Sequence, residues 1–324
     1  MPLQSRLFPA TPMPLDIISE ICSYADFRVL LLSVAPASHA MREMVSAELL
    51  LRHKKVFEKF ANNPQAFRSL LRRHKAAITG AVVLQMFCPQ FSDIDHYDVH
   101  VPLRALDDVL DHLLLIENYT VLEDNKIASS PVEVGHSCSH PALLYRSGIA
   151  RLVVLQRGAR LVHVIASGTD SITDCATLPL GFSWSTLFFN YISADAVRCA
   201  YPQLTFNGRG LWHWDRVLHR SFPEGTNPIE LNKYGELGFA LQRWADEWDM
   251  DASGTVRSCD HSWCCPLLPR TFVDRGSFGL VLGTSKTSEL DIRWVFGGRP
   301  CPDVCHHTAP VVPYVHSPQC PRAS

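Results

Sequence analysis

Acidic residues and histidines gather in one short stretch, Ile78 to Pro102, and their spacing suits metal-ion chemistry. Asp93 and Asp95 are two positions apart, and Asp98 follows in a run that alternates polar and apolar residues up to Pro102. Residues i and i+2 of a β-strand share a face, so such a pair offers both carboxylates to one site. Paired carboxylates hold the divalent ions that neutralise phosphates and activate an attacking hydroxyl. The stretch is therefore a candidate catalytic site for phosphate chemistry.

The residues before the acids follow a strand, turn and helix pattern. Residues 76–78 are apolar and predict a strand, Gly80 predicts a tight turn, and residues 81–87 predict a short helix that Pro89 ends. Backbone N–H groups at the start of a helix can face an anion. Gly80 and Ala81 are therefore the candidate nucleotide-binding residues.

Several segments together carry a resemblance to a known group of proteins. They are residues 76–102, Gly158 to Ile165, Phe182 to Ile192, Cys199-Ala200-Tyr201-Pro202 with Leu204-Thr205, and Cys264-Cys265-Pro266 with Arg270 and Asp274. These segments resemble uncharacterised fungal proteins that have a nucleotidyltransferase-like domain, often preceded by F-box-like helices. The resemblance spans most of residues 13–282 and implies a fold more firmly than a reaction. It implies Mg²⁺ as the cofactor if the site is active.

The acids fit this resemblance in two registers. In the first, Asp93 and Asp95 are the carboxylate pair. In the second, His96-Tyr97-Asp98-Val99-His100-Val101-Pro102 matches a family-like Asp-Leu-Asp-Ile-Tyr-Val-Pro pattern, with His96 at the first acid and Asp98 at the second. We favour the second register because its alternation continues into the strand.

The third acid of such a site should come from a neighbouring strand. The run Arg160 to Ile165 resembles that strand, and His163 stands at the acid's place. A histidine brings no negative charge to balance a phosphate-bound Mg²⁺ and favours softer metals. The acidic triad is therefore incomplete in either register.

Cysteines and histidines near the C-terminus suggest zinc as a second chemistry. Cys259, Cys264 and Cys265, with His261, are the candidate ligands, and Cys301, Cys305, His306 or His307 could complete the set. The spacings match no common zinc finger, so incidental loop cysteines are the favoured interpretation. We expect no zinc site here.

The N-terminal residues 13–61 predict a small helical bundle. Helices are expected from Met13, over Phe27 to Val34 and from about Ser38 to Phe60, with Pro36 as a stop. The matching residues Pro14-Leu15, Ile17, Ile18, Ile21, Leu30-Leu31, Ser33-Val34 and the Ser38 to Arg42 run resemble an F-box, although Met41-Arg42 lacks the usual tryptophan.

An F-box implies docking to a Skp-type adaptor of a cullin ubiquitin ligase. The resemblance then makes Leu15, Ile18, Leu30 and Leu31 the candidate partner-binding residues. The alternative is a helical cap packed on the following domain.

The remaining chain predicts an α+β fold in which helices pack on a mixed sheet. Helices are expected over residues 65–74, 103–116, 182–192 and 237–248, strands over 97–101, 119–122, 149–156 and 160–166, and a final strand pair over 278–282 and 291–296. Residues 128–141 are expected to be a surface loop. We divide the chain into a mobile leader 1–12, an F-box-like segment 13–61, a nucleotidyltransferase-like domain 65–296 and a disordered tail 297–324.

Composition limits the partners and the compartment. With 47% hydrophobic residues, 19% charged residues and a net charge of −2, the chain is globular, and nucleic acid is an improbable partner. No apolar run is long enough to predict a membrane span. Eleven scattered cysteines are typical of buried thiols in a reducing compartment, so we expect a cytoplasmic or nuclear protein.

Two functions remain open from the sequence. The first is a non-catalytic nucleotidyltransferase-like binding domain behind an F-box-like segment. The second is an active metal-dependent nucleotidyltransferase or nucleotide binder that uses Asp93, Asp95 and Asp98 with Gly80. The missing third acid favours the first.

Overall fold

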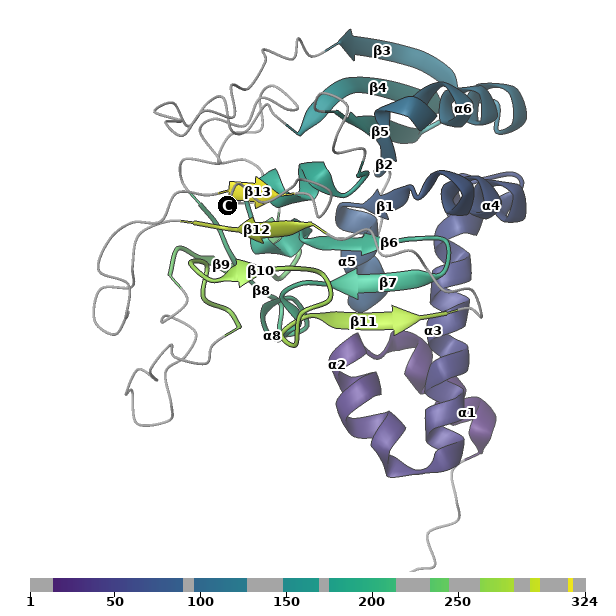
Figure 1. The fold of residues 1–324 in the computed structure, drawn as a ribbon. Helices are drawn as coiled ribbons and strands as arrows, with labels where there is room; N and C mark the ends of the chain where they lie inside the picture. The colour runs from purple at the N-terminus through teal and green to yellow at the C-terminus, as the bar shows by residue number, and fades with distance from the viewer. Residues whose placement is uncertain are drawn as a thin grey trace, which may run out of the picture.

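An eight-stranded mixed sheet organises the chain (Figure 1). The computed structural model describes residues 14–89, 96–126, 148–168, 175–213, 234–244, 263–282, 292–297 and 314–316. The sheet has the order β11-β7-β6-β1-β2-β5-β4-β3. Its strands are β1 Ala77–Thr79, β2 His96–Pro102, β3 Thr120–Lys126, β4 Ile149–Arg157, β5 Arg160–Ser167, β6 Asn190–Ile192, β7 Ala196–Cys199 and β11 Phe278–Val281. The predicted α+β class is therefore confirmed at this level.

Most helices belong to the N-terminal region or lie beside the large sheet, whereas α8 lies next to β8 (Figure 1). They are α1 Leu15–Tyr24, α2 Phe27–Val29 with the continuing turns Leu30–Val34 and Ala35–Ala37, α3 His39–Phe60, α4 Pro64–His74, α5 Ala81–Phe87, the helical run Leu103–Ala105, α6 Leu106–Asp111 and His112–Ile116, and α8 Pro202–Thr205. The predicted helices over 65–74, 81–87 and 103–116 are confirmed. No described helix has the length and apolarity needed to cross a membrane.

Side-chain caps explain where the long helices begin. The Ser38 hydroxyl accepts a hydrogen bond from the Met41 N–H at the start of α3, and Asn63 does the same for Ala66 at the start of α4. Pro64 fits the first helical position of α4, where no N–H is needed. The helical stretch beginning at Phe27 continues through Pro36, beyond the predicted stop, and ends only at Ser38.

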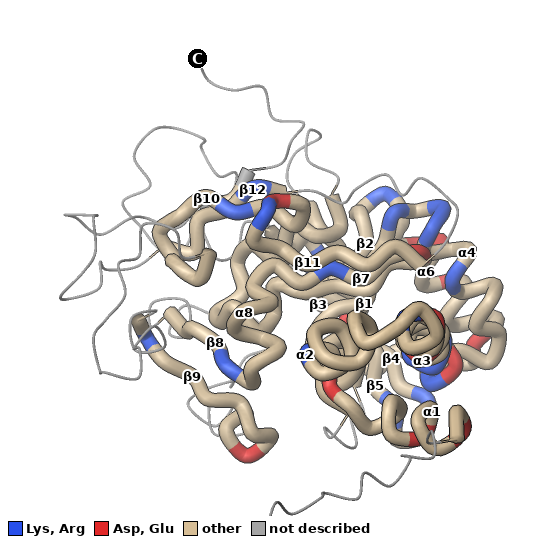
Figure 2. The backbone as a smooth tube through the Cα atoms, turned by 90° about the horizontal axis from the view of Figure 1, so that it is seen from below, with Lys and Arg blue, Asp and Glu red and all other residues tan. Residues whose placement is uncertain are grey.

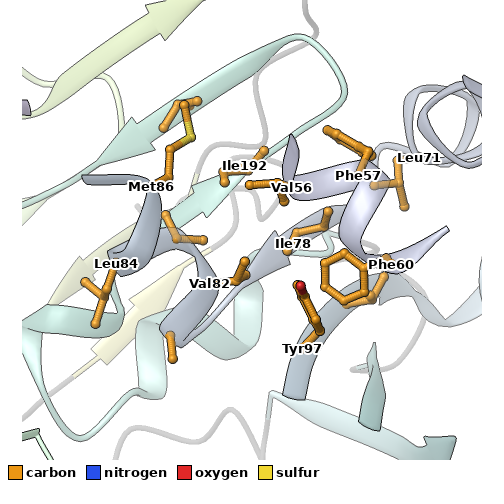
Figure 3. Close-up of a cluster of buried hydrophobic side chains, with 14 of the residues drawn as sticks. Val56, Phe57, Phe60, Leu71, Ile78, Val82, Leu84, Met86, Tyr97 and Ile192 are labelled. Atoms are coloured by element: carbon orange, nitrogen blue, oxygen red, sulfur yellow. The ribbon is translucent and has the colours of Figure 1, made fainter. Parts of the chain in front are cut away.

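One hydrophobic cluster joins the helices to the sheet. In Figure 3, Val56 and Phe60 of α3 face Ile78 of β1 and Val82 of α5. The same cluster includes Cys22, Phe27, Leu30 and Val45 from the N-terminal helices, and Val99, Val101, Val153, Val162 and Val164 from the sheet. Residues on both sides of the predicted boundary at Asn62-Asn63-Pro64 therefore share one core.

Buried Arg52 ties the N-terminal helices to α5. Its guanidinium donates to the carbonyls of Cys22 at 2.8 Å and Ala25 at 2.6 Å, to that of Met86 at 3.2 Å, and to the Glu48 carboxylate at 2.8 Å. The carbonyls at a helix C-terminus lack intrahelical donors, so one side chain satisfies the ends of both α1 and α5.

A second buried charge fixes the other end of α3. Glu117 is fully buried, and its carboxylate accepts hydrogen bonds from the backbone N–H groups of Asn62 and Asn63, at the start of α4. The Arg157 guanidinium lies 3.6 Å from this carboxylate and donates to the Phe60 carbonyl at 2.6 Å. A carboxylate is stabilised beside a helix N-terminus, so Glu117 is satisfied where it lies.

Two arginines of α4 bind Asp195, which lies in the turn between β6 and β7. Arg68 and Arg72 both contact the buried carboxylate of Asp195, at 3.0 and 2.6 Å, while Arg72 stays 41% exposed to solvent. The sequence places these residues more than a hundred positions apart, so no local pattern could reveal the pairing. Arg73 is exposed. Figure 2 shows charges of both signs interspersed along α3.

Two predicted helices in the second half are wrong. Residues 182–192 contain the last residue of the turn Leu178–Phe182, then the turn Thr186–Phe188 and strand β6. Pairing of β6 with β1 and β7 overrides the helical pattern, although Trp184, Leu187 and Phe189 are buried as expected. In the predicted helix 237–248, Ala240–Gln242 is strand β9, parallel to β8 Arg209–Leu211, and residues 245–248 lie outside the described part.

The C-terminal strands also pair differently from the prediction. β11 joins β7 in the large sheet, whereas β12 Arg293–Val295 lies between β10 Pro269–Arg270 and β13 Tyr314–His316. Within the predicted disordered tail, residues 314–316 are thus a strand. The rest of that tail beyond residue 297, the leader up to residue 13 and the predicted loop 128–141 are outside the described residues.

The role of Arg52 can be tested by mutation. Arg52→Met should lower the free energy of unfolding by about 3–5 kcal/mol, because it strands a buried Glu48 and several helix-end carbonyls. The matched control Arg73→Met, at an exposed position of α4, should change it by no more than about 0.5 kcal/mol. If urea unfolding curves show equally small losses in the free energy of unfolding for both variants, Arg52 does not stabilise the packing of α1 and α5.

Candidate functional site

Three adjacent strands bring Gly80, Asp98 and His163 together. Thr79, the last residue of β1, lies opposite Asp98 in the antiparallel β1–β2 pair, and Gly80 follows it. Asp98 lies opposite His163 in the parallel β2–β5 pair. Residues that are paired across strands share a face, so the turn, the acid and the histidine meet on one side of the sheet.

Gly80 is required at its position by both its backbone and its neighbour. Its φ of 78° and ψ of −155° fall in a region that is essentially restricted to glycine. A Cβ at this position would lie 2.5 Å from Oδ2 of Asp98. The Asp98 carboxylate therefore fills the space that the missing side chain leaves.

Asp98 and His163 form a hydrogen-bonded pair. Nδ1 of His163 lies 3.0 Å from Oδ1 of Asp98, and the two side chains are 19% and 24% exposed. Burial opposes the charge on Asp98, but the hydrogen bond from His163 and its electrostatic attraction outweigh burial and hold the pKa of Asp98 below its ordinary value. An ionised carboxylate only accepts, so Nδ1 of His163 carries the proton.

Two further histidines of β2 share this face. His96, Asp98 and His100 alternate along the strand, and the rings of His96 and His163 have centroids 6.0 Å apart. His100 is buried, and burial lowers its pKa to about 4, against the attraction of Asp98 and a hydrogen bond with the backbone of Ala176. His100 is therefore neutral at physiological pH.

The strand on which the favoured register depends is present in the structure. The predicted strand His96 to Pro102 is present, and His96 and Asp98 share a face. Asp93 and Asp95, the pair of the other register, lie outside the described residues. Within the described chain, Asp98 is the carboxylate that contacts His163, so the region seen here combines one acid with histidines.

The turn at Gly80 offers little to a nucleotide phosphate. Ala81 is buried, and the Asp98 carboxylate lies directly against the Gly80 backbone. A negative charge at that distance repels a second anion. The simplest role of Gly80 is thus to leave room for the Asp98 carboxylate.

The zinc candidates are only partly described. Cys264 and Cys265 are buried, and the Cys264 thiol donates to Oε1 of Gln203 at 3.3 Å. Cys259 and His261 lie outside the described residues, as do Cys301, Cys305, His306 and His307. In the part of the chain that the structure describes, no three His, Cys, Asp or Glu side chains are grouped closely enough to hold a metal ion by themselves.

The partner-binding candidates divide between core and surface. Leu30 is fully buried, and Ile18 and Leu31 are partly buried against the same core, so of the four only Leu15, at 60%, is well exposed. The N-terminal helices nevertheless expose an apolar set, defined here as the α1–α2 surface: Leu15, Ile17, Ile21, Tyr24, Val29 and Leu32. Ile17, Ile21 and Tyr24 are spaced i, i+4 and i+7 and thus share one face of α1.

Sequence reasoning missed some of these features for identifiable reasons. The exposure of Tyr24 and Leu32 was not predicted, because the sequence of a helix that is apolar on two faces does not reveal which face is buried. The approach of His96 to His163 follows only from the parallel register of β2 and β5, which the chain separates by more than sixty residues. The helical period of Ile17, Ile21 and Tyr24 is the one local signal that was available.

The two reasons for a glycine at position 80 can be separated by mutation. Gly80→Ala should lower the free energy of unfolding by about 3 kcal/mol, because it combines backbone strain with a clash against Asp98. Gly158 has φ 61° and no atom within 4 Å of an added Cβ, so Gly158→Ala is the matched control and should cost about 1 kcal/mol. Similar losses in thermal or urea unfolding would contradict a tight contact between Gly80 and Asp98.

Comparison with known proteins identifies no relative of this chain. No family model matches the chain, and neither does any curated protein or solved structure.

Proposed function

We propose that this chain is a non-catalytic, nucleotidyltransferase-like binding protein whose N-terminal helices dock a Skp-type adaptor of a cullin ubiquitin ligase. The observation that carries the docking part is the α1–α2 surface, which exposes six large apolar side chains within residues 15–32. Burying a side chain of this size contributes about 1.5–3 kcal/mol. Exposed large apolar side chains that share a helix face, as Ile17, Ile21 and Tyr24 do, are a feature of protein-binding surfaces.

The helices that bear this surface are held in place before any partner binds. Arg52 secures the end of α1 through the carbonyls of Cys22 and Ala25, and the Asp26 side chain caps the start of α2 by accepting from the Val29 N–H at 2.7 Å. A preorganised surface loses less conformational entropy on binding. This rigidity supports a docking role for α1 and α2.

The geometry around Asp98 supports the non-catalytic part. Its carboxylate is engaged by His163 on one oxygen and packs against Gly80 with the other. Two-metal phosphoryl chemistry needs several carboxylates around the ions, and a neutral histidine cannot replace their charge. We infer that the nucleotidyltransferase-like part binds rather than catalyses.

The alternative is an active metal-dependent nucleotidyltransferase or nucleotide binder. The adjacency of Gly80 and Asp98 is the observation that favours it, because the expected glycine turn and an acid of the strand do meet. Asp93 and Asp95 would have to supply the further carboxylates.

Docking can be measured with purified full-length chain and a purified Skp-type adaptor. Ile21→Asp places a charge on a side chain that is 53% exposed on α1, so it should weaken binding at least about tenfold without unfolding the protein. Calorimetric titration gives the dissociation constant, and circular dichroism checks the fold. Leu30→Asp would be a poor test, because Leu30 is in the core.

Leu115→Asp is the matched control for docking. Leu115 is 77% exposed and lies after α6, outside the α1–α2 surface, so this variant should bind the adaptor as the unmodified chain does. Absence of binding by the unmodified chain, or equal binding by Ile21→Asp, would refute the adaptor role.

The catalytic alternative has its own test. A fluorescent nucleoside triphosphate titrated in the presence and absence of Mg²⁺ should show no Mg²⁺-dependent binding, since the described site offers Mg²⁺ one carboxylate that is already hydrogen-bonded. Mg²⁺-dependent binding that Asp98→Asn abolishes would instead restore the nucleotidyltransferase.

A further inference from the structure

We propose that the carboxylate of Asp98 is a binding site for an alkylammonium group, on the sheet face that carries His163. The ligand is a lysine side chain of a partner protein or a free amine with the same head group, and it supplies the positive charge that this carboxylate lacks. The inference rests on the proposed function and deepens it, because it names what the nucleotidyltransferase-like part binds.

Asp98 differs from other carboxylates that the fold withdraws from solvent. Four of these each contact an arginine, at 2.8, 3.6, 2.6 and 2.7 Å: Glu48 with Arg52, Glu117 with Arg157, Asp195 with Arg72 and Asp274 with Arg270. The Asp98 side chain is only 24% exposed, yet its ion-pair partner among the described residues is His163, not a lysine or an arginine. A guanidinium is always charged, whereas an imidazole is charged only when it is protonated. Asp98 therefore has no permanent counter-charge in the described part of the chain.

Both members of the pair have acceptor positions to spare. An ionised carboxylate has about four such positions, and the hydrogen bond from His163 takes one of them, on Oδ1 of Asp98. Because Nδ1 of His163 carries the proton, Nε2 of the neutral ring is a second acceptor on the same face. Both side chains, and Gly80 beside them, are partly exposed to solvent. Acceptors next to a negative charge select a ligand that is positive and only donates.

The occupied oxygen favours an ammonium group over a guanidinium. A guanidinium binds a carboxylate best through two parallel N–H···O bonds, one to each oxygen. Oδ1 of Asp98 already accepts from His163, and Oδ2 lies against Gly80, so this fork is not available. An ammonium group has three rotatable donors and can satisfy separate acceptors. A metal ion fits less well, because no three His, Cys, Asp or Glu side chains of the described residues are grouped to hold one.

Two apolar side chains next to His163 suit the stem of such a ligand. Val154 lies opposite His163 in the antiparallel β4–β5 pair, and Leu161 is two residues before His163 on β5, so the three share one face. Val154 and Leu161 are half-buried, so part of each stays open. A lysine side chain lays its methylene groups on apolar surface and keeps its charged head at a polar site. The face therefore favours an alkyl chain that ends in an ammonium group.

Ligand-observed NMR titrations of the full-length chain test the site with two probes. N-acetyl-lysine methylamide represents a lysine of a partner protein, and putrescine represents a free amine. A pH of about 8 keeps an ordinary imidazole neutral, and an ionic strength of about 0.15 M screens unspecific attraction. Binding of both probes supports recognition of the ammonium group itself, and binding of one probe alone also identifies the source. N-acetyl-arginine methylamide should bind more weakly than the lysine probe.

Two variants and a matched control locate the binding. Asp98→Asn removes the charge and keeps the shape, so it should weaken binding of the lysine probe at least about tenfold. Leu161→Lys tethers an ammonium group to the same face and should also suppress binding while Asp98 is retained. Asp124→Asn makes the same change in net charge at a side chain that is 38% exposed and pairs with Arg151 at 2.6 Å, so it should leave the affinity unchanged. Unfolding curves identify any variant that has lost its fold.

Three results would overturn the proposal: no binding of either probe to the unmodified chain, unchanged binding in Asp98→Asn and Leu161→Lys, or tighter binding of the arginine probe. Adaptor docking is measured separately, on a surface that contains neither Asp98 nor His163. Loss of amine binding with intact docking would refute this inference alone, and loss of docking with intact amine binding would refute only the adaptor role.

Discussion

The buried polar contacts along α3 are the constraint on which the rest of the structure depends. Arg52 joins this helix to the ends of α1 and α5, and Nε2 of His53 donates to the Ser193 carbonyl at 3.0 Å, while burial lowers the pKa of His53 to about 4. At the end of the helix, Glu117 holds the α3–α4 junction. Each group is costly to bury alone and is stabilised only when its distant partner is in place. These contacts therefore favour one arrangement of helices on the sheet.

The sheet uses its two faces for different purposes. Tyr97, Val99 and Val101 of β2 enter the hydrophobic cluster under α3 and α5. The alternate residues carry the histidines and Asp98 on the opposite face. Strand alternation thus allows one seven-residue segment to build the core and to present a polar group of residues. The same segment explains why a single glycine turn, at residue 80, must lie so close to an acid.

Much of the fold could be predicted from local signals in the sequence. Helix α5 and strands β2, β4 and β5 were each expected at nearly their observed bounds, because Gly80 and the alternation of polar and apolar residues mark them strongly. The segment 182–192 was mistaken for a helix because its aromatic residues are buried by strand pairing that the local sequence does not encode. For the site, Gly80, Asp98 and His163 were all named in advance. The hydrogen bond between Asp98 and His163 and the proximity of His96 depend on the register of the strands, which the sequence does not reveal.

Arg52 also has a consequence for distances across the molecule. Helix α3 has 22 residues and is therefore about 33 Å long, and it packs against both the N-terminal helices and α5, whose N-cap is Gly80. Because carbonyls at the ends of α1 and α5 accept from one guanidinium, a movement of α1 away from α5 would have to break these buried hydrogen bonds. The exposed apolar residues of α1 therefore keep their position relative to α5 and the Gly80 turn for as long as these buried hydrogen bonds are intact.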